Sequence, residues 1–259
     1  MVSQGYPWYV DFFRGDYLNV YGHTFSEERA EKESGFVASA LELKPGASVL
    51  DLCCGQGRHS IQLARRGLRV TGLDLNPEYL ELAKQAAKAS KVTIETVAAD
   101  MRRIPFEEKF DAIVNMYSSF GYLESEGEDL KVLESAAKAL KAGGRILLDM
   151  LNREWAIDNY IQNDWHTGAD GTLYVERRDL DLATSRMHVH FIVVDPKGSR
   201  RESIGHIIRL YTLTEMARLL EGVGLQVTAV FGGFDGEGYA IGTRRMIIVA
   251  RQGPAPAPE

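Results

Sequence analysis

Residues 49–58 of the chain read VLDLCCGQGR, and the fold assignment starts from this stretch. Its first half is short and apolar, as in a strand that is buried on both faces of a sheet. Gly55 and Gly57 then make a tight turn, because glycine lets the backbone approach a neighbour or a ligand without a Cβ clash. A helix is expected over residues 58–66, ending at Gly67. The stretch therefore predicts a strand, a glycine turn and the start of a helix.

Alternating strand and helix signals continue on both sides of this stretch. A capping box of Thr24 and Glu27 is expected to open a helix that runs to about Leu43. Short apolar runs predict strands, and periodic segments between them predict helices: strands over 48–52, 69–73, 92–97, 112–115 and 145–150, and helices over 76–89 and 129–140. This rhythm predicts an α/β fold with a doubly wound, mostly parallel sheet.

The pattern changes after residue 150. Three consecutive β segments with no helix between them predict an antiparallel meander over 173–182, 186–195 and 203–210. A helix over 214–221 and two strands over 226–231 and 245–251 are expected to complete the main sheet. The expected domains are an aromatic and helical cap (1–43), a core (44–150), a β-rich lid (151–210), the remainder of the core (211–252) and a disordered tail (253–259).

Composition limits the range of functions. The chain has 259 residues and a net charge of −6, which argues against a general nucleic-acid binder because phosphate affinity needs an excess of Lys and Arg. No apolar run reaches the ~20 residues that cross a bilayer. Cys53 and Cys54 are adjacent and could form only a strained disulfide, so we expect reduced thiols. A cytoplasmic monomer or homodimer without nucleic-acid or membrane partners is expected.

Acidic residues end the second and third expected strands. Asp74 follows one apolar run, and Asp100, followed by Met101, ends the next. A carboxylate at the carboxyl edge of such a sheet can accept hydrogen bonds from the hydroxyls of a ribose. A nicotinamide-dependent oxidoreductase is one alternative, because dinucleotide enzymes use a similar glycine turn.

Five segments in this order resemble the motif series of class I S-adenosylmethionine-dependent methyltransferases: 51–57, Asp74, 99–101, 110–114 and 140–145. The resemblance covers about residues 45–150, and the terminal hairpin extends it to about 252. It implies a seven-stranded sheet of order 3-2-1-4-5-7-6 with strand 7 antiparallel. It also implies S-adenosylmethionine as cofactor and methyl transfer to a nitrogen, oxygen or sulfur of a small-molecule acceptor.

The same resemblance implies roles for individual residues. Asp51 would lie near the methionine end of the cofactor, Asp74 would bind the ribose, and Asp100 with the Met101 backbone would hold the adenine. The full set of expected cofactor contacts is Tyr21, Asp51, Cys53, Gly55, Gly57, Arg58, Asp74, Leu75, Asp100, Met101 and Asn115. The family usually has glycine at the Cys53 position, which leaves a non-catalytic S-adenosylmethionine-binding module as a further alternative.

The acceptor side is expected in the β insertion, the N-terminal aromatics and the loop after the fourth strand. The insertion resembles the lids of N-methyltransferases that act on glycine or amino sugars. Ring faces attract cations, so aromatic residues near position 20 are expected beside the sulfonium. The expected substrate contacts are Tyr17, His23, Tyr117, Ser118, Arg209 and Tyr211.

The catalytic candidates are Tyr117, His188 and His190. Tyr117 follows the strand where the nucleophile lies in this fold. The two histidines alternate along one strand, so they point to the same face. No third ligand accompanies them, and no metal is expected.

Overall fold

The computed structural model describes residues 8–15 and 17–253. The chain forms two compact units, one of residues 1–26 and 157–210 and the other of residues 27–156 and 211–259. The helix before the first strand groups with the second unit. The tail expected from residue 253 lies, from residue 254 onward, outside the described residues.

The described elements follow one another along the chain as α1 (Trp8–Arg14), α2 (Tyr17–Tyr21), η1 (Gly22–Thr24), α3 (Glu27–Ala40), β1 (Ser48–Leu52), α4 (Arg58–Arg65), β2 (Arg69–Asp74), α5 (Pro77–Ala89), β3 (Glu95–Ala98), η2 (Met101–Arg103), β4 (Phe110–Asn115), α6 (Glu126–Ala139), β5 (Leu140–Leu151), α7 (Arg153–Asp158), β6 (Asn163–Thr167), β7 (Leu173–Asp181), β8 (Arg186–Val194), β9 (Arg200–Arg209), α8 (Leu213–Gly222), β10 (Leu225–Phe231) and β11 (Arg245–Gln252). Here η marks a 3₁₀ helix.

The larger unit, residues 27–156 and 211–259, is built on a seven-stranded sheet of order β3-β2-β1-β4-β5-β11-β10. The strands β1 to β5 pair in parallel, whereas β11 runs antiparallel to both β5 and β10. This topology is the expected order 3-2-1-4-5-7-6 with an antiparallel seventh strand, so the predicted fold class is confirmed.

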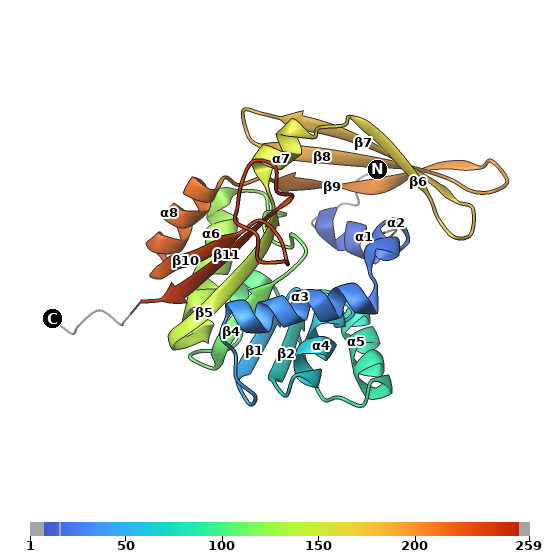
Figure 1. Ribbon diagram of the computed structural model, residues 1–259. Helices are drawn as coiled ribbons and strands as arrows, with labels where there is room; N and C mark the ends of the chain where they lie inside the picture. Colours follow the sequence, from blue (N-terminus) through green and yellow to red (C-terminus); the bar gives the residue numbers. More distant parts are fainter. Residues whose placement is uncertain (1–7, 16, 254–259) are drawn as a thin grey trace. The chain divides into compact units, whose positions relative to one another are not determined.

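Helices cover both faces of this sheet. In Figure 1, α3, α4 and α5 lie on one face, and α6 and α8 lie on the other. Every residue of β1 is buried, in agreement with its mainly apolar sequence. Helix α5 begins as predicted, because the Asn76 side chain accepts a hydrogen bond from the Glu78 N–H and Pro77 occupies the first turn. Because β1 to β5 run parallel, their carboxyl ends lie at the same edge of the sheet. This edge carries the candidate site.

The smaller unit contains a four-stranded antiparallel sheet of order β6-β7-β8-β9. The predicted meander is confirmed, and β6 adds an edge strand that the sequence pattern did not indicate. Alternate residues of β8 are buried, among them Met187, Val189 and Phe191. Within this unit the Phe12 ring lies 4.9 Å from the ring of buried His206, so α1 contributes to the same apolar layer.

The predicted capping box is wrong. Helix α3 begins at Glu27, so Glu27 is its first residue and not its third. Thr24 belongs to η1, and its hydroxyl donates to the Tyr21 carbonyl. The short 3₁₀ turn therefore intervenes where the sequence pattern suggested a direct entry into the helix.

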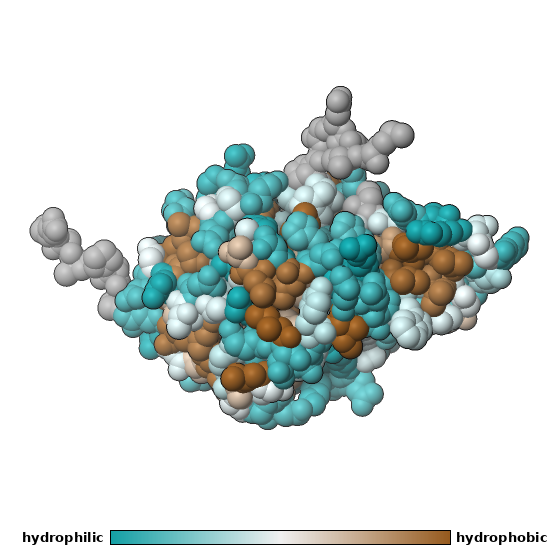
Figure 2. Space-filling model, turned by 90° about the horizontal axis from the view of Figure 1, so that it is seen from above, coloured by the Kyte–Doolittle hydropathy of each residue, from teal (hydrophilic) through white to brown (hydrophobic). Residues whose placement is uncertain are grey.

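Several large hydrophobic side chains are exposed. Figure 2 shows separate groups of hydrophobic residues among hydrophilic ones on the face that it presents. Within residues 8–15 and 17–253, no helix is both long enough and apolar enough to span a bilayer.

Candidate functional site

The first component of the site is the end of β1. Asp51 is 1% exposed, and its carboxylate accepts a hydrogen bond from the Ser60 hydroxyl at 2.6 Å. Burial raises the pKa of Asp51, because a charged carboxylate loses its hydration there. Ser60, which lies in α4, thus orients the buried carboxylate of Asp51.

The turn after β1 adopts left-handed backbone conformations. Cys53, Gly55 and Gly57 have φ values of 64°, 54° and 77°. A Cβ on Gly57 would lie 2.9 Å from the Cβ of Ala83, so the turn packs directly on α5. A Cβ on Gly55 would meet no described atom within 4 Å, which leaves this part of the backbone open to a ligand.

Asp74 connects the turn to the end of β2. One carboxylate oxygen accepts the Gly55 N–H at 2.8 Å, and the other accepts the Asn76 N–H at 2.9 Å. Burial raises the pKa of Asp74 despite these bonds. The next residue, Leu75, is a large apolar side chain that is 44% exposed. A carboxylate and an exposed apolar side chain therefore stand next to each other at this strand end.

Asp100 follows β3 and caps η2. Its carboxylate accepts from the Arg102 N–H at 2.9 Å and from the Arg102 guanidinium at 2.6 Å. Burial alone would raise the pKa of Asp100, but the bonds and charge of Arg102 lower it below the usual value. The Cys53 thiol lies 3.5 Å from the Met101 sulfur, which links the glycine turn to η2.

This arrangement fits a ligand that carries several hydrogen-bond donors. Burial, together with the charges of Asp74, Asp51 and Asp100, raises the pKa of Cys53 well above the usual range. All three carboxylates thus disfavour the charged thiolate form of Cys53. Because carboxylates accept hydrogen bonds, they suit the ammonium, ribose hydroxyls and adenine amino group of S-adenosylmethionine.

The end of β4 supplies the next polar groups. The Asn115 amide donates to the Leu52 carbonyl at 3.0 Å and joins β4 to β1. The amide oxygen of Asn115, Oδ1, is buried and accepts no hydrogen bond from the described residues. Since buried polar atoms are normally paired, this oxygen is available to a donor.

Tyr117 and Ser118 form a strained turn one residue after the end of β4, with φ values of 57° and 58°. Asp149 at the end of β5 accepts the Tyr117 N–H at 2.8 Å through its side chain and the Ser118 N–H at 2.9 Å through its carbonyl. The Arg245 guanidinium pairs with Asp149 at 2.6 Å and donates to the Ser118 hydroxyl at 3.0 Å.

Two guanidinium groups lie against the Tyr117 ring. The Arg58 carbon Cζ is 5.0 Å from the ring centroid, and that of Arg29 is 5.6 Å away. Both distances are within the range of cation–π attraction. Basic groups therefore gather where the first turn of α4 and the loop after β4 come together.

Glu33 of α3 holds these cations in place. Its carboxylate accepts from Arg29 at 2.6 Å, from Arg58 at 3.2 Å and from the His59 ring at 2.7 Å. Burial would raise the pKa of Glu33, but His59 and the two arginines lower it to about 2. The carboxylate is therefore charged at neutral pH and orients both guanidinium groups.

The structure brings many of the predicted residues together at this edge: Asp51, Cys53, Gly55, Gly57, Arg58, Asp74, Leu75, Asp100, Met101, Asn115, Tyr117 and Ser118. Sequence analysis missed Arg29, Glu33, Asp149 and Arg245. No local motif marks these four residues, because their importance lies in side-chain partners that are distant in sequence. A signal was available for Arg29 and Glu33 alone, whose i,i+4 spacing on α3 suits an ion pair.

The N-terminal candidates belong to the smaller unit. Tyr17 and Tyr21 lie in an aromatic cluster, with ring centroids 5.5 Å apart, and Tyr21 also contacts Phe191. The His23 ring lies 4.4 Å from that of His166. Their expected contacts with cofactor and substrate stay predictions.

The lid candidates also have defined places in that unit. His188 and His190 alternate with the buried residues of β8 and point to its opposite face, where His190 is exposed. Arg209 ends β9, is buried and donates to the Leu210 carbonyl. Nothing in these contacts indicates a base, and the role of the histidines stays a prediction.

Tyr211 belongs to the larger unit. It is 1% exposed, and its hydroxyl donates to buried Asp129 at 2.7 Å. Its ring contacts Phe120, with the centroids 5.6 Å apart. These contacts stabilise the packing of α6 and give Tyr211 a structural role in addition to its predicted substrate contact.

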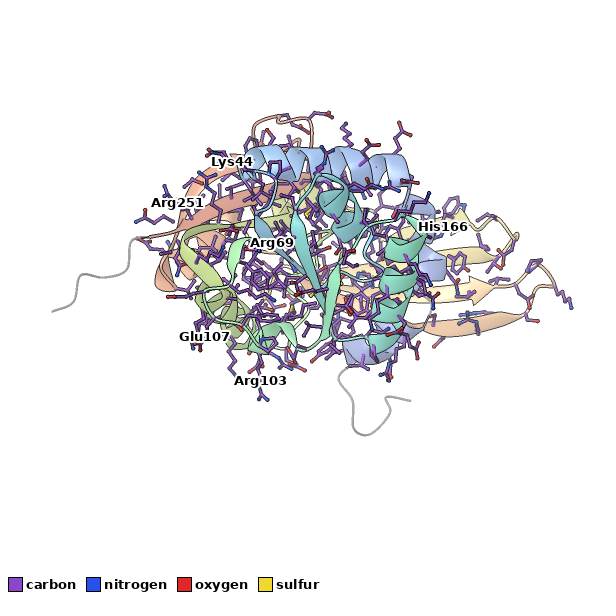
Figure 3. The ribbon with its side chains drawn as sticks, turned by 90° about the horizontal axis from the view of Figure 1, so that it is seen from below. Lys44, Arg69, Arg103, Glu107, His166 and Arg251 are labelled. Atoms are coloured by element: carbon purple, nitrogen blue, oxygen red, sulfur yellow. The ribbon has the colours of Figure 1, made fainter. Side chains whose placement is uncertain are left out.

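The opposite edge of the sheet is populated by charged surface side chains. Figure 3 labels Lys44, which precedes β1, Arg69 at the start of β2, Glu107 before β4 and Arg251 near the end of antiparallel β11. Across the described part of the chain, no group of three or more His, Cys, Asp or Glu side chains could hold a metal ion.

Comparisons with known proteins identify the family of this chain. A methyltransferase domain family matches residues 49–144. The chain is 30% identical over 203 residues to the dTDP-3-amino-3,4,6-trideoxy-alpha-D-glucopyranose N,N-dimethyltransferase of Streptomyces venezuelae, across 76% of this chain and 82% of that protein.

Solved structures share the fold. The CcbJ methyltransferase from Streptomyces caelestis superimposes with a TM-score of 0.79 at 20% identity, over 95% of this chain and 99% of that one. The S-adenosylmethionine-bound CalS10, an amino pentose methyltransferase from Micromonospora echinaspora, gives 0.68 at 21% identity, over 98% and 100%.

Neither a nicotinamide-dependent oxidoreductase nor a non-catalytic binding module is favoured by these matches, which name methyltransferases. The motif series and the sheet order agree with the same family. So does the carboxylate-lined turn, by which we mean the turn after β1 with Asp51, Asp74 and Asp100. The chain belongs to the class I S-adenosylmethionine-dependent methyltransferases and is an enzyme that uses this cofactor.

Proposed function

We propose that this enzyme methylates an amine nitrogen of a small molecule, and that an amino sugar is the preferred class of acceptor. The S. venezuelae relative acts on an amino sugar by its name, and CalS10 is named for an amino pentose. The relative matches at 30% identity over most of both chains. That match is the observation that carries the choice of nitrogen over oxygen or sulfur.

The carboxylate-lined turn is the proposed seat of the cofactor. Asp74 lies at the end of β2 with both oxygens turned toward backbone N–H groups of the turn region, and it would accept from the ribose. Exposed Leu75 would pack on the adenine, beside Asp100. Asp51 and the unpaired oxygen of Asn115 would accept from the methionine ammonium.

Arg29 and Arg58 are the proposed partners of the methionine carboxylate. Arginine pairs well with carboxylates, because its guanidinium offers donors in a fixed fork. Glu33 offsets one of the two positive charges. The Asp51 and Asp149 carboxylates also act on these arginines, so the pairing is proposed from the guanidinium donors and not from an excess of positive charge.

In the proposed mechanism, the bound cofactor supplies an electrophilic methyl group on a sulfonium. The chain's own residues align the attacking nitrogen with that methyl and exclude water, which is the main requirement of an in-line displacement. Tyr117 and Ser118 would face the acceptor from the end of β4. Methylation needs the neutral amine, so a base or solvent must accept its proton.

Parallel incubations test the choice of nitrogen. The purified enzyme and S-adenosylmethionine are mixed with a dTDP-linked 3-amino sugar, a catechol or an aliphatic thiol, and mass spectrometry detects added methyl groups. Methylation of the amino sugar alone is the expected result. A methylated catechol or thiol, with an unreacted amino sugar, would overturn the proposal.

A further inference from the structure

The turn after β4 is held in a conformation that its residues do not favour. Tyr117 and Ser118 are consecutive, neither is glycine, and both have φ near +57°. Left-handed backbone brings Cβ close to the following carbonyl oxygen, so such residues persist only where their surroundings determine them strongly. The contacts of the turn must therefore stabilise this conformation.

Asp149 and Arg245 supply those contacts. Asp149 binds the N–H groups of both turn residues, one with its carboxylate at 2.8 Å and one with its carbonyl at 2.9 Å. Arg245 neutralises the carboxylate and also holds the Ser118 hydroxyl at 3.0 Å. The pair is largely buried, with Asp149 and Arg245 side chains 3% and 15% exposed.

The conformation of the turn sets the direction of the Tyr117 side chain. With this backbone, the ring lies against Arg58 and Arg29, the two cations on Glu33. In a relaxed right-handed turn the Cα–Cβ bond would point elsewhere, and the ring would leave both guanidinium groups. Asp149 and Arg245 thus determine, through the backbone of the turn, whether the Tyr117 ring contacts the two arginines.

We propose that Asp149 and Arg245 are positioning residues that hold Tyr117 in the methyl-transfer site. Arg245 opens β11, so the terminal hairpin, remote in sequence from the glycine turn, completes the site. The inference rests on the proposed function in one respect, namely that Tyr117 faces the acceptor.

A magnetic-resonance signature of the Tyr117 ring tests the proposal. Protein labelled with ¹⁵N-arginine should show an Arg58 Nε–H resonance shifted by the ring current of Tyr117. Arg58→Lys assigns this resonance, and Tyr117→Leu gives its position without the ring. We expect Asp149→Asn and Arg245→Met to move the resonance to the Tyr117→Leu position.

Arg251→Met is the matched control, because Arg251 lies on the same strand but is exposed and donates to the Gly143 carbonyl. It should leave the resonance unchanged. Should Arg245→Met fail to fold, the double variant with Asp149→Asn removes both buried charges and is read in the same way. An unshifted resonance in Asp149→Asn and Arg245→Met, or in the double variant, would overturn the proposal.

Arg245→Lys adds a graded response. Lysine keeps the charge but offers no planar fork, so it can pair with Asp149 while losing the bond to Ser118. In this variant the Arg58 Nε–H resonance should lie between its positions in the wild type and in Arg245→Met. The measurement needs no acceptor, so it separates failure of this inference from failure of the proposed amine specificity.

Discussion

The backbone N–H of Gly55 donates to the carboxylate of Asp74 at 2.8 Å. This bond joins the turn after β1 to the end of β2, so it holds the open backbone of the turn next to the proposed ribose acceptor. The position of the carboxylate therefore depends on the turn, and the turn depends on the carboxylate.

Replacing Asp74 should weaken cofactor binding. A hydrogen bond to a charged group contributes about 1.5–3 kcal/mol, so Asp74→Ala should raise the Kd for S-adenosylhomocysteine roughly tenfold to a hundredfold. Calorimetric titration measures this change. Glu78→Ala, an exposed carboxylate in the first turn of α5, is the control and should bind like the wild type. An unaltered Kd in Asp74→Ala would contradict the assigned ribose contact.

Arg29→Gln and Arg58→Gln should weaken S-adenosylhomocysteine binding by about tenfold each, because a charge-assisted bond to the carboxylate is lost. Binding of 5′-methylthioadenosine, which has no carboxylate, should stay the same. Calorimetry with both ligands separates the two effects. Arg66→Gln, on an exposed residue that contacts the Glu31 carbonyl, serves as control. Equal losses for both ligands would refute the carboxylate assignment.

Glu33 should make stability depend on acidity. Its pKa is about 2 in the folded chain, against an ordinary 4.5, so its contribution is complete above pH 4.5 and is lost as the pH falls toward 2. That shift corresponds to about 3 kcal/mol at neutral pH. Urea unfolding of Glu33→Gln should show this deficit at pH 7 and roughly half of it at pH 3.

The control for this experiment is Glu31→Gln, an exposed carboxylate on the same helix. It should change the unfolding free energy little at either pH. A Glu33→Gln deficit of the same size at pH 7 and pH 3 would show that the effect comes from packing and not from charge.

Cys53 should tolerate glycine but not a β-branched residue. At φ 64°, a β-branched side chain is strained, so Cys53→Val should lower the unfolding free energy by about 2 kcal/mol. Cys53→Gly should stay within about 1 kcal/mol of the wild type, since relief of strain offsets the entropy cost of glycine. Thermal unfolding measures both variants, and an equally stable valine variant would argue against strain at this turn.

The order of elements in the larger unit could be predicted because it rests on local signals. Strands such as β1 are buried on both faces and read as apolar runs, and Asn76 with Pro77 marks a helix start in any context. The entry to α3 could not be predicted, because Thr24 found a partner in the preceding turn. Edge strand β6 was missed because all of its residues except Trp165 are polar, so its sequence shows no apolar alternation.

By itself, the sequence determined the fold class, the glycine turn and the carboxylates at the strand ends, because these are properties of neighbouring residues. Only the tertiary structure brought Arg29 and Arg58 to the ring of Tyr117, and only it paired Asp149 with Arg245. These contacts join residues from different helices and strands. Their energies depend on burial and distance, which the order of residues along the chain does not specify.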